Sequence, residues 1–268
     1  RSAERPILSY RNIPKALILP EKFPCRVRAS CILDNGAALR FSLHSGMKEK
    51  GTVYLIGAGP GDAGLLTIRG KEVLGRSDAV VYDYLVNPKI LSLARADAEI
   101  IYVGKKAGSK ERSQGEINRL LVARALGGKT VARLKGGDPF IFGRGGEEAE
   151  ALSSKGVPFE IIPGVTSASA VPAYAGIPLT HRDVTSSFAV VTGHEDPRKE
   201  SSNIPWDALS KIGTVVFLMG VRNIGKNMRK LMEHGKPART PVAVITWGTY
   251  PAQVTATGTV GTIERVVK

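Results

Sequence analysis

From residue 47 onward, short apolar runs alternate with segments in which apolar residues recur every three or four positions. The runs are typical of buried strands, and the recurring pattern is typical of helices. In the first half, strands are expected at 53–56, 79–82, 100–103, 130–134 and 159–162, and helices at 65–74, 114–126 and 145–155. In the second half, strands are expected at 188–192, 214–219, 241–246 and 253–258, and a helix at 223–234. This alternation predicts an α/β fold of two domains, 47–163 and 164–268, each a mainly parallel or mixed sheet flanked by helices.

Both ends of the chain depart from this rhythm. Four prolines interrupt the first 24 residues, and no helical or strand period persists through residues 1–46. We expect this segment to be an irregular extension outside the α/β fold, with Met47 as the natural start; a transit peptide is the alternative. Residues 260–268 have the pattern of a helix with no closing strand after it, so the second domain is expected to be truncated before its last strand.

The charge of the chain narrows the classes of partner. Lys and Arg number 38 against 24 Asp and Glu, a net charge of +14, which favours an anionic partner. Only 6% of residues are aromatic and no Lys/Arg tract occurs, which argues against nucleic-acid binding. No apolar run approaches the roughly 20 residues that span a bilayer. Cys25 and Cys31 both precede Met47, so the α/β region has no cysteine for a disulfide or metal site. A membrane surface and an acidic small molecule both remain possible partners at this point.

The first candidate ligand loop, Gly57-Ala58-Gly59-Pro60-Gly61-Asp62, follows an expected strand. Glycines at the carboxyl end of a parallel strand let a ligand approach the backbone closely. The spacing departs from the dinucleotide fingerprint, because Asp62 replaces the third glycine and Pro60 lacks an N–H donor. A plain turn and a nicotinamide-dependent oxidoreductase both remain alternatives at this point.

A second loop has five glycines within 11 residues, between the strand at 130–134 and the helix at 145–155. Its carboxylate, Asp138, can accept hydrogen bonds from ribose hydroxyls or face a cationic ligand. Lys135 and Arg144 place positive charge beside it and are candidate contacts for an acidic substrate. The length and mixed charge of the loop favour binding over a purely structural turn.

The third stretch begins at Pro163-Gly164-Val165 and leads into an expected helix. Thr166 or Ser167 can cap that helix, and such a helix start also binds polar or anionic groups. His181 and Arg182, which follow later, are candidate donors to substrate carboxylates.

Together, these loops resemble the S-adenosylmethionine-dependent tetrapyrrole methylase family. The resemblance spans about residues 52–261 and is specific, because many strings match in the same order. The matching strings are LIGAGPGD (55–62), VVYD (80–83), GKKAG (104–108), QGEIN (114–118), RLKGGDPF (133–140), GRGGEE (143–148), PGVTSA (163–168), AYAGIPLTHR (173–182), TGH (192–194), FLMG (217–220) and WGT (247–249).

The resemblance implies a two-domain enzyme, usually a homodimer, with its active-site cleft between the domains. The sequence shows no targeting signal, which fits a cytoplasmic enzyme, and a plastid or mitochondrial address is the alternative. Similar enzymes transfer methyl groups to C-2 and C-7 of uroporphyrinogen III. They form precorrin-2 through precorrin-1 for sirohaem and cobalamin synthesis, release S-adenosylhomocysteine and use no metal. By similarity, S-adenosylmethionine is held by Pro60, Gly136, Gly137, Asp138, Ile141, Thr166, Ser167, Met219 and Gly248.

Two residues are implied as catalytic. By similarity, Asp83 accepts a proton and Lys105 donates one. From the residues alone, a carboxylate at a strand end can act as such a base, while Lys105 can equally pair with a substrate carboxylate. A later precorrin methyltransferase and an RNA methylase are the remaining alternatives.

Overall fold

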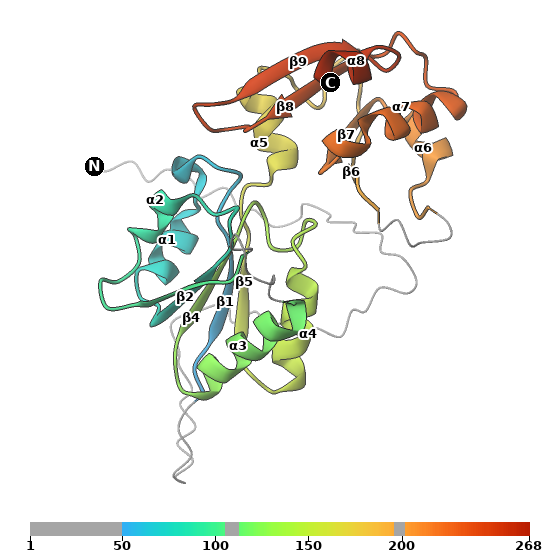
Figure 1. The fold of residues 1–268 in the computed structure, drawn as a ribbon. Coiled ribbons are helices and arrows are strands. Elements are labelled where there is room, and N and C mark those ends of the chain that lie inside the picture. Colours follow the sequence, from blue (N-terminus) through green and yellow to red (C-terminus); the bar gives the residue numbers. More distant parts are fainter. Residues whose placement is uncertain (1–49, 105–112, 196–201) are drawn as a thin grey trace, which may run out of the picture.

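The computed structural model describes residues 50–104, 113–195 and 202–268. The expected irregular segment 1–46 and the expected proton donor Lys105 lie outside these ranges. The first half, in the lower part of Figure 1, contains five parallel strands in the order β3-β2-β4-β1-β5. They are β1 (Val53–Gly57), β2 (Ala79–Tyr82), β3 (Glu99–Tyr102), β4 (Val131–Lys135) and β5 (Phe159–Ile162). Each lies within one residue of the segment expected from its apolar run.

Both faces of this sheet are covered by helices, since alternate residues of each strand point to opposite sides. The helices are α1 (Ile68–Leu74) and α2 (Pro88–Leu91) on one face, and α3 (Gln114–Leu126) and α4 (Gly145–Ser154) on the other (Figure 1). The core under α3 and α4 contains Val53, Leu55, Val81, Leu121, Val131 and Leu152. The core under α1 and α2 contains Ile56, Val73, Leu74, Val80, Ile90 and Leu134. The prediction of a doubly covered parallel sheet is therefore confirmed for this half.

Capping residues set the boundaries of its helices. The Ser113 hydroxyl accepts from the Glu116 N–H, and the Glu116 carboxylate accepts from the Ser113 N–H, so α3 begins where it was expected. The helix expected over 65–74 is wrong at its start. Thr67 caps α1, and the 3-10 turn η1 (Ala63–Leu65) is separate from it.

The second half contains two smaller pairs of strands. β6 (Phe188–Thr192) pairs in parallel with β7 (Thr214–Leu218), and β8 (Pro241–Thr246) forms an antiparallel hairpin with β9 (Val254–Thr259). Among the described residues these pairs are separate sheets, where one sheet was expected. The helical elements are α5 (Ser167–Tyr174), α6 (Trp206–Lys211), η2 (Val221–Asn223), α7 (Ile224–Glu233) and α8 (Ile263–Val267). The core of this half includes Leu209, Met228, Leu231, Val260 and Ile263.

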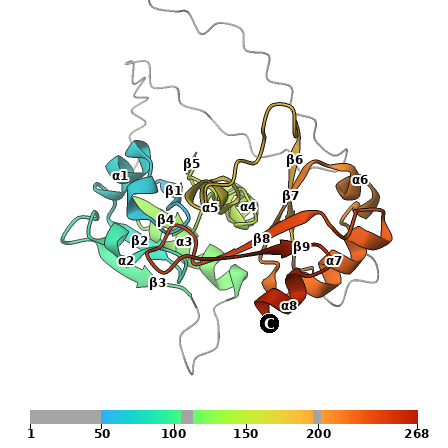
Figure 2. The ribbon, with the colours of Figure 1, turned by 90° about the horizontal axis from the view of Figure 1, so that it is seen from above.

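The two halves approach each other at α5 and at the turn of the β8–β9 hairpin. In Figure 1, α5 lies between the parallel sheet and the hairpin. Seen from above in Figure 2, the hairpin extends from the second half toward the first. The Asp62 N–H donates to Thr249 Oγ1 at 3.0 Å, which fixes this approach at the loop after β1.

Candidate functional site

The loops after β1, β4 and β5 meet at the carboxyl edge of the parallel sheet. The Gly137 N–H donates to Gly59 O at 2.7 Å, and the Gly59 N–H donates to Gly137 O at 3.3 Å. A Cβ atom placed on Gly57 would lie 2.4 Å from the Gly164 Cα, so the backbones of these two loops are in contact. Gly137 has φ of +68°, in the region that favours glycine. The structure therefore brings together the three loops that the sequence singled out.

Asp138 holds two of these loops together. Its Oδ1 accepts from the Phe140 N–H at 2.8 Å, and its Oδ2 accepts from the Gly164 N–H at 3.0 Å. Thr166 is the N-cap of α5, where its hydroxyl accepts from the Ala168 N–H at 3.3 Å. Both side chains thus shape the site, and each carboxylate oxygen of Asp138 retains a second lone pair for a ligand.

Asp62 connects the first half of the chain to the second. Its Oδ2 accepts from the Tyr174 hydroxyl at 2.8 Å, and its backbone N–H donates to Thr249. The backbone N–H of Gly64 and the Tyr174 hydroxyl lower the pKa of Asp62, and the same carboxylate raises the pKa of Tyr174. A Cβ atom on Gly61 would lie 2.3 Å from the Tyr250 ring. The absence of a side chain at Gly61 is therefore required for this contact between the halves.

Turns at this edge and in the second half contain strained backbone. Residues other than glycine with φ between +51° and +69° occur at Phe142, Arg144, Met219, Trp247 and Thr249. Such conformations cost about 1–3 kcal/mol each, and surrounding contacts must hold them in place. A Cβ on Gly248 would lie 2.4 Å from the Val171 side chain, so α5 presses directly on the turn after β8. Met219 is 61% exposed, and Ile141 is 40% exposed.

A cluster of buried charges lies beneath the loop after β2. The Arg133 guanidinium donates to Glu148 Oε1 at 3.2 Å and to Asp83 Oδ2 at 3.1 Å. The Lys135 ammonium donates to the same Glu148 oxygen at 2.9 Å. Burial lowers the pKa of Lys135, with a further contribution from Arg133, and the carboxylate of Glu148 opposes this shift. The sequence placed Lys135 beside a ligand, but its ammonium is buried against Glu148.

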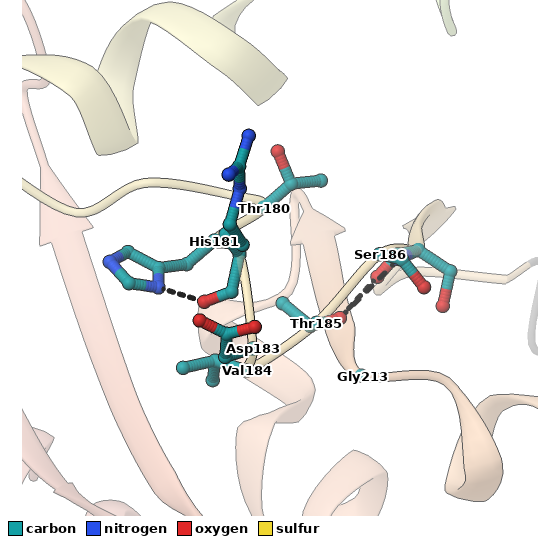
Figure 3. Close-up of a pocket in the computed structure, with 9 residues that line it drawn as sticks. Thr180, His181, Asp183, Val184, Thr185, Ser186 and Gly213 are labelled. Atoms are coloured by element: carbon teal, nitrogen blue, oxygen red, sulfur yellow. Dashed lines mark hydrogen bonds between the residues drawn. The ribbon is translucent and has the colours of Figure 1, made fainter.

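The other expected substrate contacts lie on the surface. Arg144 is exposed and forms a two-pronged ion pair with Glu147, with both N···O distances 2.8 Å. His181 and Arg182 line an open pocket formed by residues 180–187 and Gly213 (Figure 3). The His181 Nδ1 lies 2.6 Å from Arg182 O, and its backbone pairs with Thr185. These described contacts of His181 stay within its own loop.

Several contacts within the site were not found from the sequence. The pairs Asp83–Arg133, Arg133–Glu148, Asp62–Tyr174 and Asp62–Thr249 join residues that are 15 to 187 positions apart. One signal was available, because two cations within the apolar run of β4 indicate a buried counter-charge. In residues 50–104, 113–195 and 202–268, no group of three His, Cys, Asp or Glu is placed to hold a metal, and no helix is long and apolar enough to cross a membrane.

Comparison with known proteins gives consistent results. Residues 52–264 match the family model for Tetrapyrrole (Corrin/Porphyrin) Methylases. The chain is 53% identical over 224 residues to the S-adenosyl-L-methionine-dependent uroporphyrinogen III methyltransferase of Methanosarcina barkeri, which covers 81% of this chain and 88% of that protein. It is 52% identical over 219 residues to the uroporphyrinogen-III C-methyltransferase of Priestia megaterium, which covers 81% and 92%.

A solved structure extends the match to three dimensions. The uroporphyrin-III C-methyl transferase of Thermus thermophilus, complexed with S-adenyl homocysteine, superposes with a TM-score of 0.69 at 37% identity. The superposition covers 80% of this chain and 86% of that one. The family match covers the parallel sheet, the glycine loops and the turns that contain Met219 and Gly248. The chain therefore belongs to the tetrapyrrole (corrin/porphyrin) methylase family.

Proposed function

We propose that the protein catalyses the S-adenosylmethionine-dependent C-methylation of uroporphyrinogen III. The reaction places methyl groups at C-2 and C-7 and yields precorrin-2 through precorrin-1, for sirohaem or cobalamin synthesis. The observation that carries the proposal is the identity above 50%, over more than 215 residues, to two enzymes named for this activity. A later precorrin methyltransferase is the second candidate, because it shares the family and its substrate is also an acidic tetrapyrrole.

The geometry of the glycine loops fits S-adenosylmethionine. A Cβ on Gly136 would lie 2.5 Å from the Leu85 Cβ, and Gly137 is in a conformation that side chains rarely adopt, so backbone lines this part of the edge. Loop carbonyls that keep a second lone pair suit the amino group of an adenine edge, and the Asp138 carboxylate suits ribose hydroxyls. We assign this role to Pro60, Gly136, Gly137, Asp138, Ile141, Thr166, Ser167, Met219 and Gly248.

When bound, the methyl donor supplies an electrophilic methyl group on a sulfonium, so the protein needs no metal or covalent nucleophile. The S–CH₃ bond breaks as the C–CH₃ bond forms, and the sulfur keeps the electron pair. The tetrapyrrole gains positive charge and must lose one proton. We assign acceptance of that proton to Asp83, whose side chain is 22% exposed at the end of β2. Lys105, outside the described residues, keeps its proposed role as donor.

The substrate carries eight carboxylates and needs cations around it. We assign this role to Arg144, His181 and Arg182, which are exposed. Lys135 is withdrawn from this group, since Glu148 already neutralises its buried ammonium. The division at residue 163, the homodimer and the cytoplasmic location stay predictions.

The test is turnover by the full chain. Purified protein, uroporphyrinogen III and S-adenosylmethionine are incubated anaerobically, and the oxidised product is identified by its fluorescence and by a mass gain of two methyl groups. Asp83→Asn is expected to lower kcat by roughly 10²- to 10⁴-fold, the usual contribution of a general base. Calorimetry compares binding of S-adenosylmethionine with binding of NAD. Folded protein that methylates only a later precorrin, or that prefers NAD, overturns the proposal.

A further inference from the structure

Beneath Asp83, an otherwise apolar face of the sheet contains ionised groups. β4 places Val131, Arg133 and Lys135 on the side that packs against α3 and α4. Arg133 is 3% exposed and Glu148 is completely buried. A buried ion pair gives little net stability compared with apolar residues of the same size. Stability alone therefore does not account for this cluster.

The guanidinium of Arg133 is fixed by three different acceptors. Its Nε donates to Glu148 Oε1 at 3.2 Å, its Nη1 to the carbonyl of Leu134 at 2.7 Å, and its Nη2 to Asp83 Oδ2 at 3.1 Å. Glu148 in turn accepts from Lys135 at 2.9 Å and from Gln114 at 3.2 Å. The planar guanidinium of an arginine has donor N–H groups that point at all three acceptors, whereas the ammonium of a lysine cannot reach all three from one position. Glu148 thus anchors the guanidinium, and the guanidinium holds Asp83.

The second oxygen of Asp83 is also held. Its Oδ1 accepts from the Leu85 N–H at 3.1 Å, within the loop that leaves β2. With one bond to each oxygen, the carboxylate plane has a defined orientation, while each oxygen keeps a further lone pair. The side chain is 22% exposed, so this oriented group still faces outward from the sheet edge.

We propose that Arg133 is a positioning residue for the methylation reaction, holding the Asp83 carboxylate in the orientation in which it accepts the proton from the methylated tetrapyrrole. Glu148 acts one step further away, by fixing Arg133. The inference rests on the proposed function and adds a residue that touches neither the methyl donor nor the tetrapyrrole. Proton transfer to a base requires correct orientation as well as reach, and loss of orientation lowers kcat without weakening binding.

The test uses Arg133→Lys, because replacement by an apolar residue would leave Glu148 with less compensation and could prevent folding. A lysine keeps a positive charge near Glu148 but lacks the second donor group, Nη2 of the guanidinium, that reaches Asp83. We expect kcat for uroporphyrinogen III to fall by roughly 10-fold or more, with the Kd of S-adenosylhomocysteine within twofold of wild type. In the Asp83→Asn background the same substitution is expected to change kcat by less than twofold, because Arg133 then has no base to orient.

Gln114→Met is the matched control. It removes a different hydrogen bond to Glu148 and leaves the bond between Arg133 and Asp83 intact. We expect its kcat to stay within twofold of wild type, even if its Tm falls as far as that of Arg133→Lys. The inference is overturned if Arg133→Lys keeps wild-type kcat, if its effect multiplies fully with Asp83→Asn, or if Gln114→Met loses as much activity. Absence of turnover by the wild-type protein instead refutes the proposed function, and the inference with it.

Discussion

Replacing Glu148 by Gln should destabilise the fold strongly, and by an amount that depends on pH. The Glu148 side chain is completely buried, and one of its oxygens accepts from both Arg133 and Lys135. The substitution preserves size and leaves two buried cations without this anion. Breaking a buried ion pair in this way costs about 3–5 kcal/mol.

Part of this loss of stability comes from the Lys135 ammonium that is left without its anion. That part cannot exceed the free energy needed to deprotonate Lys135. A lysine with an ordinary pKa of 10.5 can lose its proton at pH 7 for about 4.8 kcal/mol, and at pH 9.5 for about 1.4 kcal/mol. Burial already lowers the pKa of Lys135, and removal of Glu148 lowers it further. The unfolded chain then binds more protons than the folded one between the lowered pKa and 10.5, so stability rises with pH across that window. The loss caused by Glu148→Gln should therefore shrink by as much as about 3 kcal/mol between pH 7 and 9.5.

The assays are urea unfolding and thermal unfolding, each followed by far-UV circular dichroism at both pH values. For a loss of about 4 kcal/mol, Tm at pH 7 should fall by roughly 8–15 °C. Adding Lys135→Met should recover much of the loss, because it removes a cation that has lost its anion. Glu147→Gln on the same helix is the control, since its pair with Arg144 is exposed and is worth about 0.5 kcal/mol. A Glu148→Gln loss below about 1 kcal/mol, or one equal at both pH values, would refute the reasoning.

Two further predictions concern packing and surface charge. Gly57→Ala would place its Cβ 2.4 Å from the loop after β5 and should lower the free energy of unfolding by about 2–3 kcal/mol, whereas Gly115→Ala, with nothing within 4 Å, should be neutral or stabilising in the same urea titration. The arginine and lysine partners of Glu99 lower its pKa from 4.5 to about 2, so its contribution to stability is present above pH 4.5 and is lost as pH falls toward 2. Because the group is 35% exposed, that contribution is about 1 kcal/mol, and the unfolding midpoints of Glu99→Gln and wild type should converge as pH falls to about 2.

The sequence predicts the parallel sheet well because each of its strands contains an apolar run, and the runs of β1, β2 and β4 are largely buried on both faces. The start of α3 was also predictable, since Ser113 and Glu116 form a local capping box. The boundary at Thr67 is equally local, but apolar spacing alone extended α1 by three residues in the amino-terminal direction. α2 was missed from the sequence, because its four residues make little more than one turn and are too few to show a repeating apolar pattern. Local sequence signals thus predict most strands and helices of this half. The errors are one helix start, at Thr67, and one very short helix, α2.

Only part of the candidate site could be predicted from the sequence. The loops at Gly57 and Gly137 could be predicted, because parallel strands end at a common edge. Their contacts with the second half could not, since Asp62 and Thr249 are 187 positions apart and meet only through the packing of the β8–β9 turn. That packing depends on the fit of whole surfaces, such as Gly61 against Tyr250, for which the sequence has no periodic signal.

The structure also shows that not all of the positive charge of the chain is available to bind a ligand. Residues from Met47 onward were expected to direct their excess of cations toward an acidic ligand. Arg133 and Lys135, two of the cations nearest the glycine loop, instead point into the core and are matched there by Glu148 and Asp83. Attraction of an octacarboxylate must then come from exposed cations, whereas the buried Arg133 holds a carboxylate of the protein itself, that of Asp83. The same residue type thus serves binding when exposed to solvent and orientation when buried, and burial, which composition does not show, decides between the two.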